Sequence, residues 1–224
     1  MLFKTRGIIL KYTKYKESSL IVNIYTEEFG LGSYIINSVR SKKSKTGMGL
    51  FQPLNLVELV VYNKENVEIN RISEIRSSHP YHSIPSNIKK SSIVIFLTEV
   101  LYKCLRTSEQ DQDKELFSFI FHSLILLDSM DTGLVNFHLA FLLKLSKYLG
   151  FAADIEVEFQ ELGKDTFGIV EQLLEGNYYD EITLDRLKRE KILNSIIHFY
   201  QHHIHGFGEL KSFAILKEVF LPVR

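Results

Sequence analysis

The sequence is poor in the features that mark several large classes of protein. It has one cysteine in 224 residues, Cys104, which excludes an internal disulfide and a multi-cysteine zinc site. No apolar run approaches the roughly 18–20 residues that a membrane-crossing helix needs. Charged residues follow the start too early for a signal peptide. We therefore expect a protein of a reducing compartment, most simply the cytoplasm, with no membrane partner.

Catalytic motifs are missing as well. There is no Gly-x-x-x-x-Gly-Lys-Ser/Thr loop, no Gly-x-Gly-x-x-Gly after a strand and no Gly-x-Ser-x-Gly elbow. Cys104 lies in an apolar, helix-like stretch without a partner base, so it is predicted to be a small core residue. We predict no catalytic residue and no enzyme activity.

The net charge of zero hides an asymmetry along the chain. Residues 1–82 hold 12 lysines and arginines against 7 acidic residues, whereas the remainder holds 15 against 20. A basic front and an acidic back indicate a module that faces a polyanion, joined to a module with another task.

The front of the chain reads as a small β-barrel. Alternating and β-branched residues predict five strands, at 5–12, 19–26, 34–39, 54–62 and 67–75. Five consecutive strands with short turns fit a closed barrel, either an OB-fold, which commonly binds oligonucleotides, or an SH3-like barrel. Pro80 and Pro85 mark its boundary, so we predict one domain over 1–80 and a second over 81–224.

The back of the chain reads as a helical bundle. Apolar residues at helical spacing predict helices over 88–106, 116–127, 134–149, 183–205 and 209–220, with Thr183 as the N-cap of the fourth. The stretch 151–182 has no clear pattern. The predicted fold class is α+β, with an N-terminal five-stranded barrel followed by an all-helical domain.

The stretch 39–47 is the strongest functional signal that the residues themselves give. It holds four cations within six residues and no acid, between two predicted strands. Such a loop can follow a phosphate backbone without reading sequence, although an isolated charge run is more often a solvated loop. Nearby lysines would extend the basic track, and a tyrosine among them could stack on a base. The predicted DNA-binding residues are Arg40, Lys42, Lys43, Lys45, Lys11, Lys14, Lys16 and Tyr15.

A histidine cluster is the other group of interest: His198, His202, His203 and His205. His198 and His202 have the i, i+4 spacing that places two metal ligands on one helix face. No cysteine or acid lies nearby at matching helical spacing, however, and helix C-termini favour histidines without a metal. We predict neither a metal nor a cofactor.

Several motifs together resemble the bacterial RecO recombination mediators. Tyr15-Lys-Glu17 through Thr26-Glu-Glu-Phe-Gly30 is similar to the front signature of that family, and 39–44 to its basic segment. Leu50-Phe-Gln-Pro-Leu54 resembles the run that follows. Lys147-Tyr-Leu-Gly-Phe151 and Glu209-Leu-Lys-Ser212 resemble landmarks of its helical domain. The resemblance extends in order over nearly the whole chain.

The resemblance implies a function. Such proteins bind single- and double-stranded DNA through an OB-fold and anneal complementary strands, without covalent chemistry. They engage the acidic tail of single-stranded-DNA-binding protein and a partner, RecR, and help to load a recombinase at the nucleoid. Two departures stand out. Many members carry a four-cysteine zinc site, but 152–182 here holds no cysteine, and Asn37-Ser38 replaces the usual glycine-containing turn before the basic segment.

Two other classes of function remain open at this point. The chain could be a protein-interaction adaptor whose barrel binds no DNA and whose basic loop is incidental. It could also be a metal-dependent hydrolase that uses the region of His205. Salt-sensitive binding to an oligonucleotide separates the adaptor from the mediator, and metal analysis tests the hydrolase.

Overall fold

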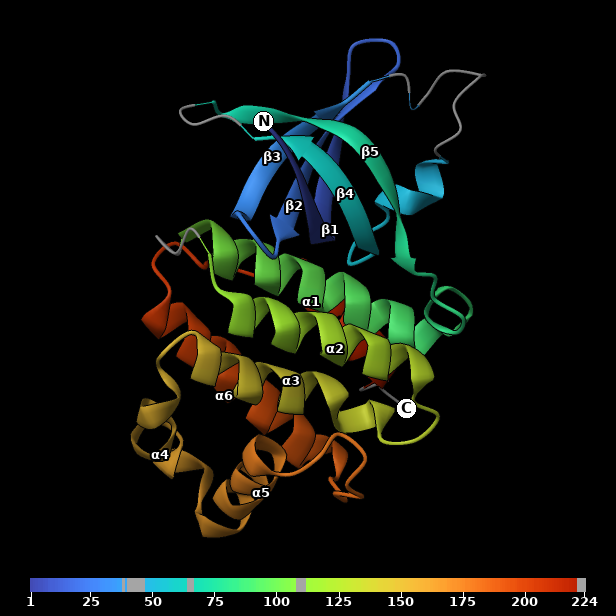
Figure 1. The fold of residues 1–224 in the computed structure, drawn as a ribbon. Helices are drawn as coiled ribbons and strands as arrows, with labels where there is room; N and C mark the ends of the chain where they lie inside the picture. Colours follow the sequence, from blue (N-terminus) through green and yellow to red (C-terminus); the bar gives the residue numbers. More distant parts are fainter. Residues whose placement is uncertain (38, 40–46, 64–66, 108–111, 221–224) are drawn as a thin grey trace. The chain divides into compact units, whose positions relative to one another are not determined.

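The computed structural model describes residues 1–37, 39, 47–63, 67–107 and 112–220 (Figure 1). The chain divides into two compact units, each of which combines two segments of the sequence. The first unit is Met1–Tyr81 with Ser108–Ile125, and the second is His82–Thr107 with Leu126–Arg224. None of the helices in the described part combines the length and the apolar character that a lipid bilayer demands of a spanning segment.

The first unit contains a closed five-stranded barrel. Its strands are β1 (Leu2–Tyr15), β2 (Ser19–Thr26), β3 (Gly30–Ile36), β4 (Leu56–Tyr62) and β5 (Ile69–His79). They close in the order β1-β2-β3-β5-β4, with β3 and β5 parallel and the other neighbours antiparallel. This topology is that of the OB-fold, so the predicted barrel is confirmed.

Strand β1 closes the barrel because it pairs along its first half with β4 and along its second half with β2. Gly7 lies where the two pairings overlap. A Cβ atom there would approach Ile24 Cγ2 to 2.7 Å and Leu59 Cδ2 to 2.9 Å. Glycine at this position therefore leaves room for the side chains of Ile24 and Leu59, which pack against the backbone of β1.

The third strand differs from the prediction of 34–39, since it begins at Gly30 and ends at Ile36. Gly30 and Gly32, which precede the predicted strand, are part of β3. Gly30 takes a positive φ of 64°, and a Cβ at Gly32 would lie 2.7 Å from the ring of Tyr34. The ring of Tyr34 thus occupies the space that a side chain at position 32 would need.

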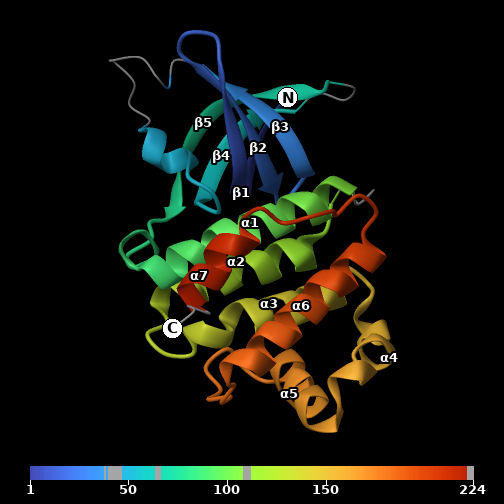
Figure 2. The ribbon, with the colours of Figure 1, turned by 180° about the vertical axis from the view of Figure 1, so that it is seen from behind.

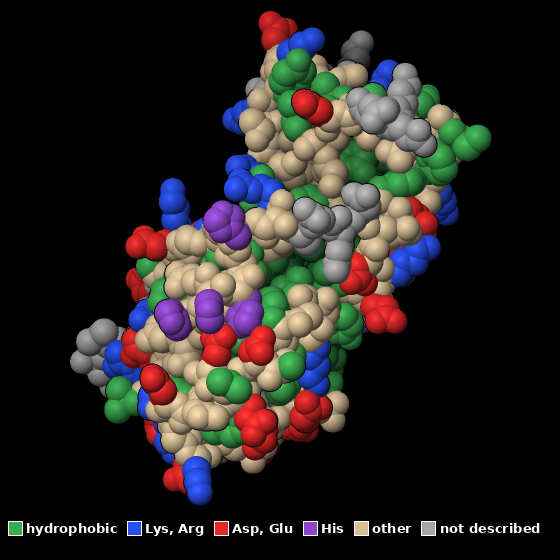
Figure 3. All heavy atoms as spheres, turned by 90° about the vertical axis from the view of Figure 1, so that its left-hand side faces the viewer, with side chains coloured by type: hydrophobic (Ala, Val, Ile, Leu, Met, Phe, Trp, Pro, Cys, Tyr) green, Lys and Arg blue, Asp and Glu red, His purple; other side chains and the backbone are tan. Residues whose placement is uncertain are grey.

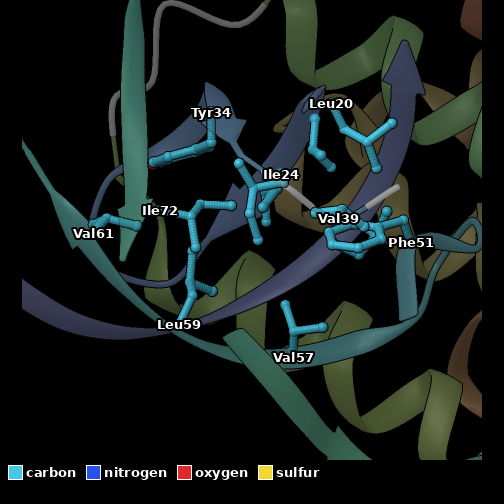
Figure 4. Packing of buried hydrophobic residues seen from close by; sticks show 12 residues of the cluster. Leu20, Ile24, Tyr34, Val39, Phe51, Val57, Leu59, Val61 and Ile72 are labelled. Carbon is cyan, nitrogen blue, oxygen red and sulfur yellow. The ribbon is translucent and has the colours of Figure 1, made fainter. Parts of the chain in front are cut away.

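The barrel core joins residues from both sides of the basic stretch. Val39 precedes most of that stretch and Phe51, in the 3-10 helix Met48–Phe51, follows it; both are buried in the same cluster as Leu20 and Val57. Figure 4 shows the side chains of Val39 and Phe51 side by side within this core. The two ends of the stretch are therefore fixed by apolar packing.

Replacing Phe51 with alanine is expected to destabilise the first unit by about 3–5 kcal/mol, because the lost contacts leave a cavity among residues that cannot collapse into it. Phe51 is completely buried. The measurement is the free energy of unfolding in urea, followed by circular dichroism. Tyr62→Ala, at an exposed position of β4, is the control and should cost far less. Equal losses in the two variants would contradict the assignment of Phe51 to the core.

The first turns of α2 (Lys114–Ser129) pack on the barrel within the first unit. Arg6 of β1 donates from Nε and Nη2 to the carboxylate of Glu27, at 2.8 and 2.6 Å, and its guanidinium lies 4.8 Å from the ring centre of Phe121. The hydrogen bond from Arg6 lowers the pKa of Glu27. The hydroxyl of Tyr25 donates to the carbonyl of Asp113 at 3.2 Å. These contacts lie near Thr26, at the C-terminal end of β2.

The second unit is helical, as predicted. Besides the end of α2 it contains α1 (Ile88–Thr107), α3 (Leu134–Tyr148), α4 (Ile155–Glu158), α5 (Lys164–Glu175), α6 (Arg186–His203) and α7 (Phe213–Phe220). The unassigned stretch 151–182 forms α4 and α5 with the 3-10 helices η3 (Ala152–Asp154) and η4 (Gln160–Leu162). Cys104 is buried, which raises the pKa of its thiol and confirms the prediction of a core residue.

Two helix starts differ from the sequence prediction. The N-cap of α6 is Asp185, whose carboxylate accepts from the N–H of Lys188 at 2.8 Å; Thr183 does not cap it. Helix α7 begins at Phe213 instead of 209. Glu99 of α1 accepts from the N–H groups of Lys211 and Ser212, at 3.0 and 2.8 Å, and so caps α7 from another helix. Figure 2 shows α7 along α1.

His138 of α3 is buried among aromatic rings in the second unit. Its ring centre lies 6.3 Å from that of Phe96 in α1 and 5.3 Å from that of Phe220 in α7. Its Nδ1 atom has no hydrogen-bond partner among the described residues. Burial, with a smaller contribution from the charge of Arg189, lowers the pKa of His138 to about 3. The imidazole is therefore neutral in the folded protein at physiological pH.

This burial predicts a loss of stability in acid. The folded state keeps His138 neutral down to about pH 3, whereas the unfolded chain protonates it near pH 6.5. Stability from this group is thus complete above pH 6.5 and falls below it, by up to about 1.4 kcal/mol per pH unit. His138→Leu should weaken the acid dependence of the free energy of unfolding. Equal acid dependence in wild type and His138→Leu would refute this account.

Candidate nucleic-acid interface

The β1–β2 hairpin carries four of the predicted DNA-binding residues, three of them at its tip and Lys11 further along β1. The last pair of the ladder is Tyr15 with Ser19, and Lys16 turns the chain with a positive φ of 49°. The Nζ atom of Lys16 lies 5.4 Å from the ring centre of Tyr15. Tyr15 is 39% exposed, so a flat ring and a cation lie together at an accessible corner of the barrel.

The structure does not place all four residues on one face of the hairpin. Successive side chains of a strand point to opposite faces. Lys11 and Tyr15 therefore lie on one face, whereas Lys14 lies on the other face together with Tyr12. Lys14 pairs with Leu20, whose side chain belongs to the barrel core, so Lys14 lies on the inner face of the hairpin. Lys11 pairs with Asn23 on the outer face. A strand of nucleic acid that contacts all four residues would have to pass over the hairpin tip.

The hairpin tip contacts the residues just before the basic stretch. The hydroxyl of Ser19 donates to Oδ1 of Asn37 at 3.0 Å, and Leu20 pairs with Ile36. The remaining predicted DNA-binding residues, Arg40, Lys42, Lys43 and Lys45, lie outside the described residues. What the structure describes are the residues that flank them, Asn37, Val39 and Gly47, of which Asn37 adjoins the hairpin.

Several other cations of the described part of the first unit lie against acids. Arg76 binds Glu58 at 2.6 Å, and Lys4 lies 3.8 Å from the same carboxylate. The hydrogen bond from Arg76 lowers the pKa of Glu58. Just after the C-terminal end of β2, Glu28 binds Lys114 at 2.9 Å. These pairs are internal to the unit, so their cations have less charge to offer a phosphate than unpaired ones would.

The tyrosines of the barrel divide between core and surface. Tyr25 and Tyr34 are buried, at 3% and 1% exposure, and so are not available to stack on a base. Tyr12 packs partly against the core, whereas Tyr15 and Tyr62 are each 39% exposed. Base stacking on the barrel is therefore restricted to Tyr15 and Tyr62 among these five, and only Tyr15 adjoins the hairpin lysines.

The histidine cluster has an acidic partner that the sequence spacing did not reveal. Oε1 of Glu158 lies 3.0 Å from Nδ1 of His202 and 2.8 Å from Nε2 of His203. Glu158 belongs to α4 and the histidines to the end of α6, so residues 44 and 45 positions apart meet only in the folded chain. His198 and His205 are exposed and are not part of this group. Local spacing carries no signal for such a contact.

Comparison with known proteins gives a consistent result for both units. The family model described as "Recombination protein O N terminal" matches residues 1–81, and the model described as "Recombination protein O C terminal" matches residues 85–161. The DNA repair protein RecO of Bacteroides fragilis is 35% identical over an alignment of 243 residues, which covers 98% of this chain and 100% of the relative.

Two further relatives agree over the same extent. The DNA repair protein RecO of Flavobacterium psychrophilum is 34% identical over 240 residues, with 98% of this chain and 100% of the relative covered. That of Azobacteroides pseudotrichonymphae is 36% identical over 242 residues, again with 98% and 100% covered. The N-terminal family model covers the OB-fold barrel, and the C-terminal model covers helices that follow it. The chain therefore belongs to the RecO family of DNA repair proteins.

Proposed function

We propose that this protein is a non-enzymatic mediator of recombinational DNA repair. It binds single- and double-stranded DNA, anneals complementary strands and helps to load a recombinase onto strands coated by single-stranded-DNA-binding protein. The observation that carries the proposal is the OB-fold barrel in a chain whose RecO relatives match over their whole length. Annealing requires two polyanions to be held close together, which cations accomplish by displacing counterions from both.

The DNA-binding role is assigned to the domain 1–80. The hairpin offers Lys11, Lys14 and Lys16 with the ring of Tyr15 beside them, and the predicted loop cations follow Asn37, to which the hairpin is hydrogen-bonded. Elsewhere on the barrel, Arg76 and Lys4 both lie against the carboxylate of Glu58. Phosphate contacts of this kind give affinity without sequence preference.

The partner-binding role is assigned to the domain 81–224. Its expected partners are the acidic C-terminal tail of single-stranded-DNA-binding protein and RecR, in the cytoplasm at the nucleoid. An acidic tail needs a cationic or apolar receptor. The cavity of about 270 Å³ beside α4 and α6 does not offer one, because Glu158 and Glu161 line it. We therefore place the tail elsewhere on this domain.

Binding of a fluorescent single-stranded oligonucleotide, measured by anisotropy over a series of salt concentrations, tests the proposal. We expect a linear fall of log affinity with log salt, with a slope of about 0.7 for each neutralised phosphate. Tyr15→Ala should weaken binding by about 1–3 kcal/mol if the ring stacks on a base, with little change in slope. The matched control is Tyr62→Ala, which removes an equally exposed ring away from the hairpin.

The adaptor remains the rival reading, and the same titration decides between the two. A protein-interaction adaptor would show no salt-sensitive binding to the oligonucleotide. That result would overturn the mediator proposal, whatever the Tyr15→Ala variant did.

A further inference from the structure

Helices α4 and α6 bring three potential metal ligands to one point of the second unit. One ligand atom each from Glu158, His202 and His203 lies within 4.8 Å of the other two. Asp154 adds a carboxylate oxygen 3.9 Å from Nε2 of His203. Figure 3 shows histidine and acidic side chains next to one another on the surface. Two imidazoles and a carboxylate are a ligand set that binds zinc and related ions in proteins.

Aromatic packing fixes the orientation of one of these ligands. The ring of His203 lies parallel to that of Phe151, with centres 4.8 Å apart, and edge-on to that of Phe199 at 4.7 Å. The side chains of His203 and Glu158 are only 19% and 21% exposed. A ligand whose rotamer is already fixed loses little conformational freedom when it binds an ion.

The third ligand lies on the open side of the cluster. The side chain of His202 is 68% exposed, and Glu158 also lines the cavity of about 270 Å³ that extends along α6. Water and ions can therefore reach the ligand atoms without a change in the packing of the unit. A fourth coordination position could be taken by water or by Asp154.

The segment that carries Glu158 has little structure of its own to hold it in place. It consists of η3, α4 and η4, each of only three or four residues, which are too short to be stable alone. Ile155 and Phe159 anchor it through buried side chains. An ion shared by α4 and α6 would join this segment to the longer helix and contribute directly to the stability of the fold.

We propose that Glu158, His202 and His203 form a binding site for one divalent transition-metal ion of the zinc class, which ties α4 to α6. The lack of cysteine in this part of the chain excludes a thiolate site only. Magnesium and calcium fit less well, because they prefer all-oxygen ligand sets. Without an ion, the carboxylate accepts hydrogen bonds from both imidazoles. When an ion binds, each of these ring nitrogens gives up its proton, to solvent or through solvent to the other ring nitrogen, and presents a lone pair to the ion.

The test uses the full chain, stripped of metal with a chelator and titrated with zinc chloride in a calorimeter. We expect saturation at one ion per chain and a rise in the melting temperature with bound zinc. Glu158→Gln and His203→Gln should each weaken zinc binding at least about tenfold, since even the loss of a residue that only supports a ligand costs that much. Magnesium chloride should give no binding.

His198→Gln is the matched control because it removes a histidine of the same helix that is not part of the cluster. It should leave zinc binding and the zinc-dependent rise in melting temperature unchanged. If His203→Gln does not fold, Glu158→Gln decides, since it keeps the size of the side chain. The proposal is overturned if wild type shows no saturable binding, if His198→Gln weakens it as much as Glu158→Gln, or if zinc leaves the melting temperature unchanged.

Discussion

Replacing Arg40, Lys42, Lys43 and Lys45 together with alanine is expected to flatten the dependence of DNA affinity on salt. Each phosphate contact that is lost should lower the slope of log affinity against log salt by about 0.7 units on single strands and about 0.9 on duplex. If all four cations contact phosphate, the loss for single strands approaches ~3 units. Because the effect is electrostatic, it should be largest at low salt and independent of sequence. Anisotropy titrations on both kinds of DNA measure it.

A control variant must remove the same charge from another surface. Lys164, Arg186, Lys188 and Lys211 are exposed residues of the second unit, and Arg186 and Lys188 lie in the first turn of α6, where a cation is not stabilising. Their joint replacement with alanine should leave the slope unchanged. If this control flattens the slope as much as the loop variant does, the effect comes from net charge, and the DNA site is not on the loop.

Removing the carboxylate of Asp128 should destabilise the second unit more than any surface change. Asp128 lies at the end of α2, is 5% exposed, and accepts from the N–H groups of His82, Ser83 and Ile84, each at 2.9 Å. Asp128→Ala removes the acceptor of three N–H groups, of which that of Ile84 is buried, at a cost of about 3–5 kcal/mol. The free energy of unfolding in urea measures this loss.

Lys90 of α1 is a buried cation at the contact between Asp128 and residues 82–84, which we call the junction. It is 1% exposed, and its Nζ donates to the hydroxyl of Ser83 at 2.6 Å and to the carbonyl of Asp128 at 2.8 Å. The aspartate carboxylate and this cation thus belong to one buried network that joins the start of α1 to the end of α2. Loss of the acid leaves the buried cation with neutral acceptors only.

Two variants separate this network from a general effect of substitution at the end of α2. Asp128→Asn keeps one carbonyl oxygen and should lose less stability than Asp128→Ala. The exposed neighbour Ser129→Ala should stay within about 0.5 kcal/mol of wild type. If the free energy of unfolding of Asp128→Ala also stays within that range, the carboxylate does not stabilise the contact between the end of α2 and residues 82–84.

Asp128 also predicts the acid behaviour of the junction. Burial opposes ionisation, but hydrogen bonds from His82, Ile84 and Ser83 outweigh it and lower the pKa of Asp128. Its contribution to stability is therefore complete above 3.8, the unperturbed value, and is lost as the pH falls through the lower folded value. The loss from His138 occurs at higher pH, so the two contributions can be resolved.

Local patterns predicted the elements whose apolar residues repeat at a regular interval. The barrel strands and α1, α2, α3 and α6 follow from periods of two or near 3.6, and the barrel follows from five short strands in succession. The errors fall at ends: β3 runs from Gly30 to Ile36 instead of over 34–39, and α7 begins at Phe213 because Glu99 of α1 caps it. Glu99 lies 113 residues before Ser212, so no local window contains this cap.

The sequence by itself determined the class of fold, the family and the basic stretch, because composition, periodicity and short motifs are properties of neighbouring residues. Only the tertiary structure decided that Val39 and Phe51 are buried together on either side of the basic stretch, and that Glu158 meets His202 and His203. The physical reason is the same in each case. A contact between distant residues depends on how the elements pack, and packing is set by the whole core.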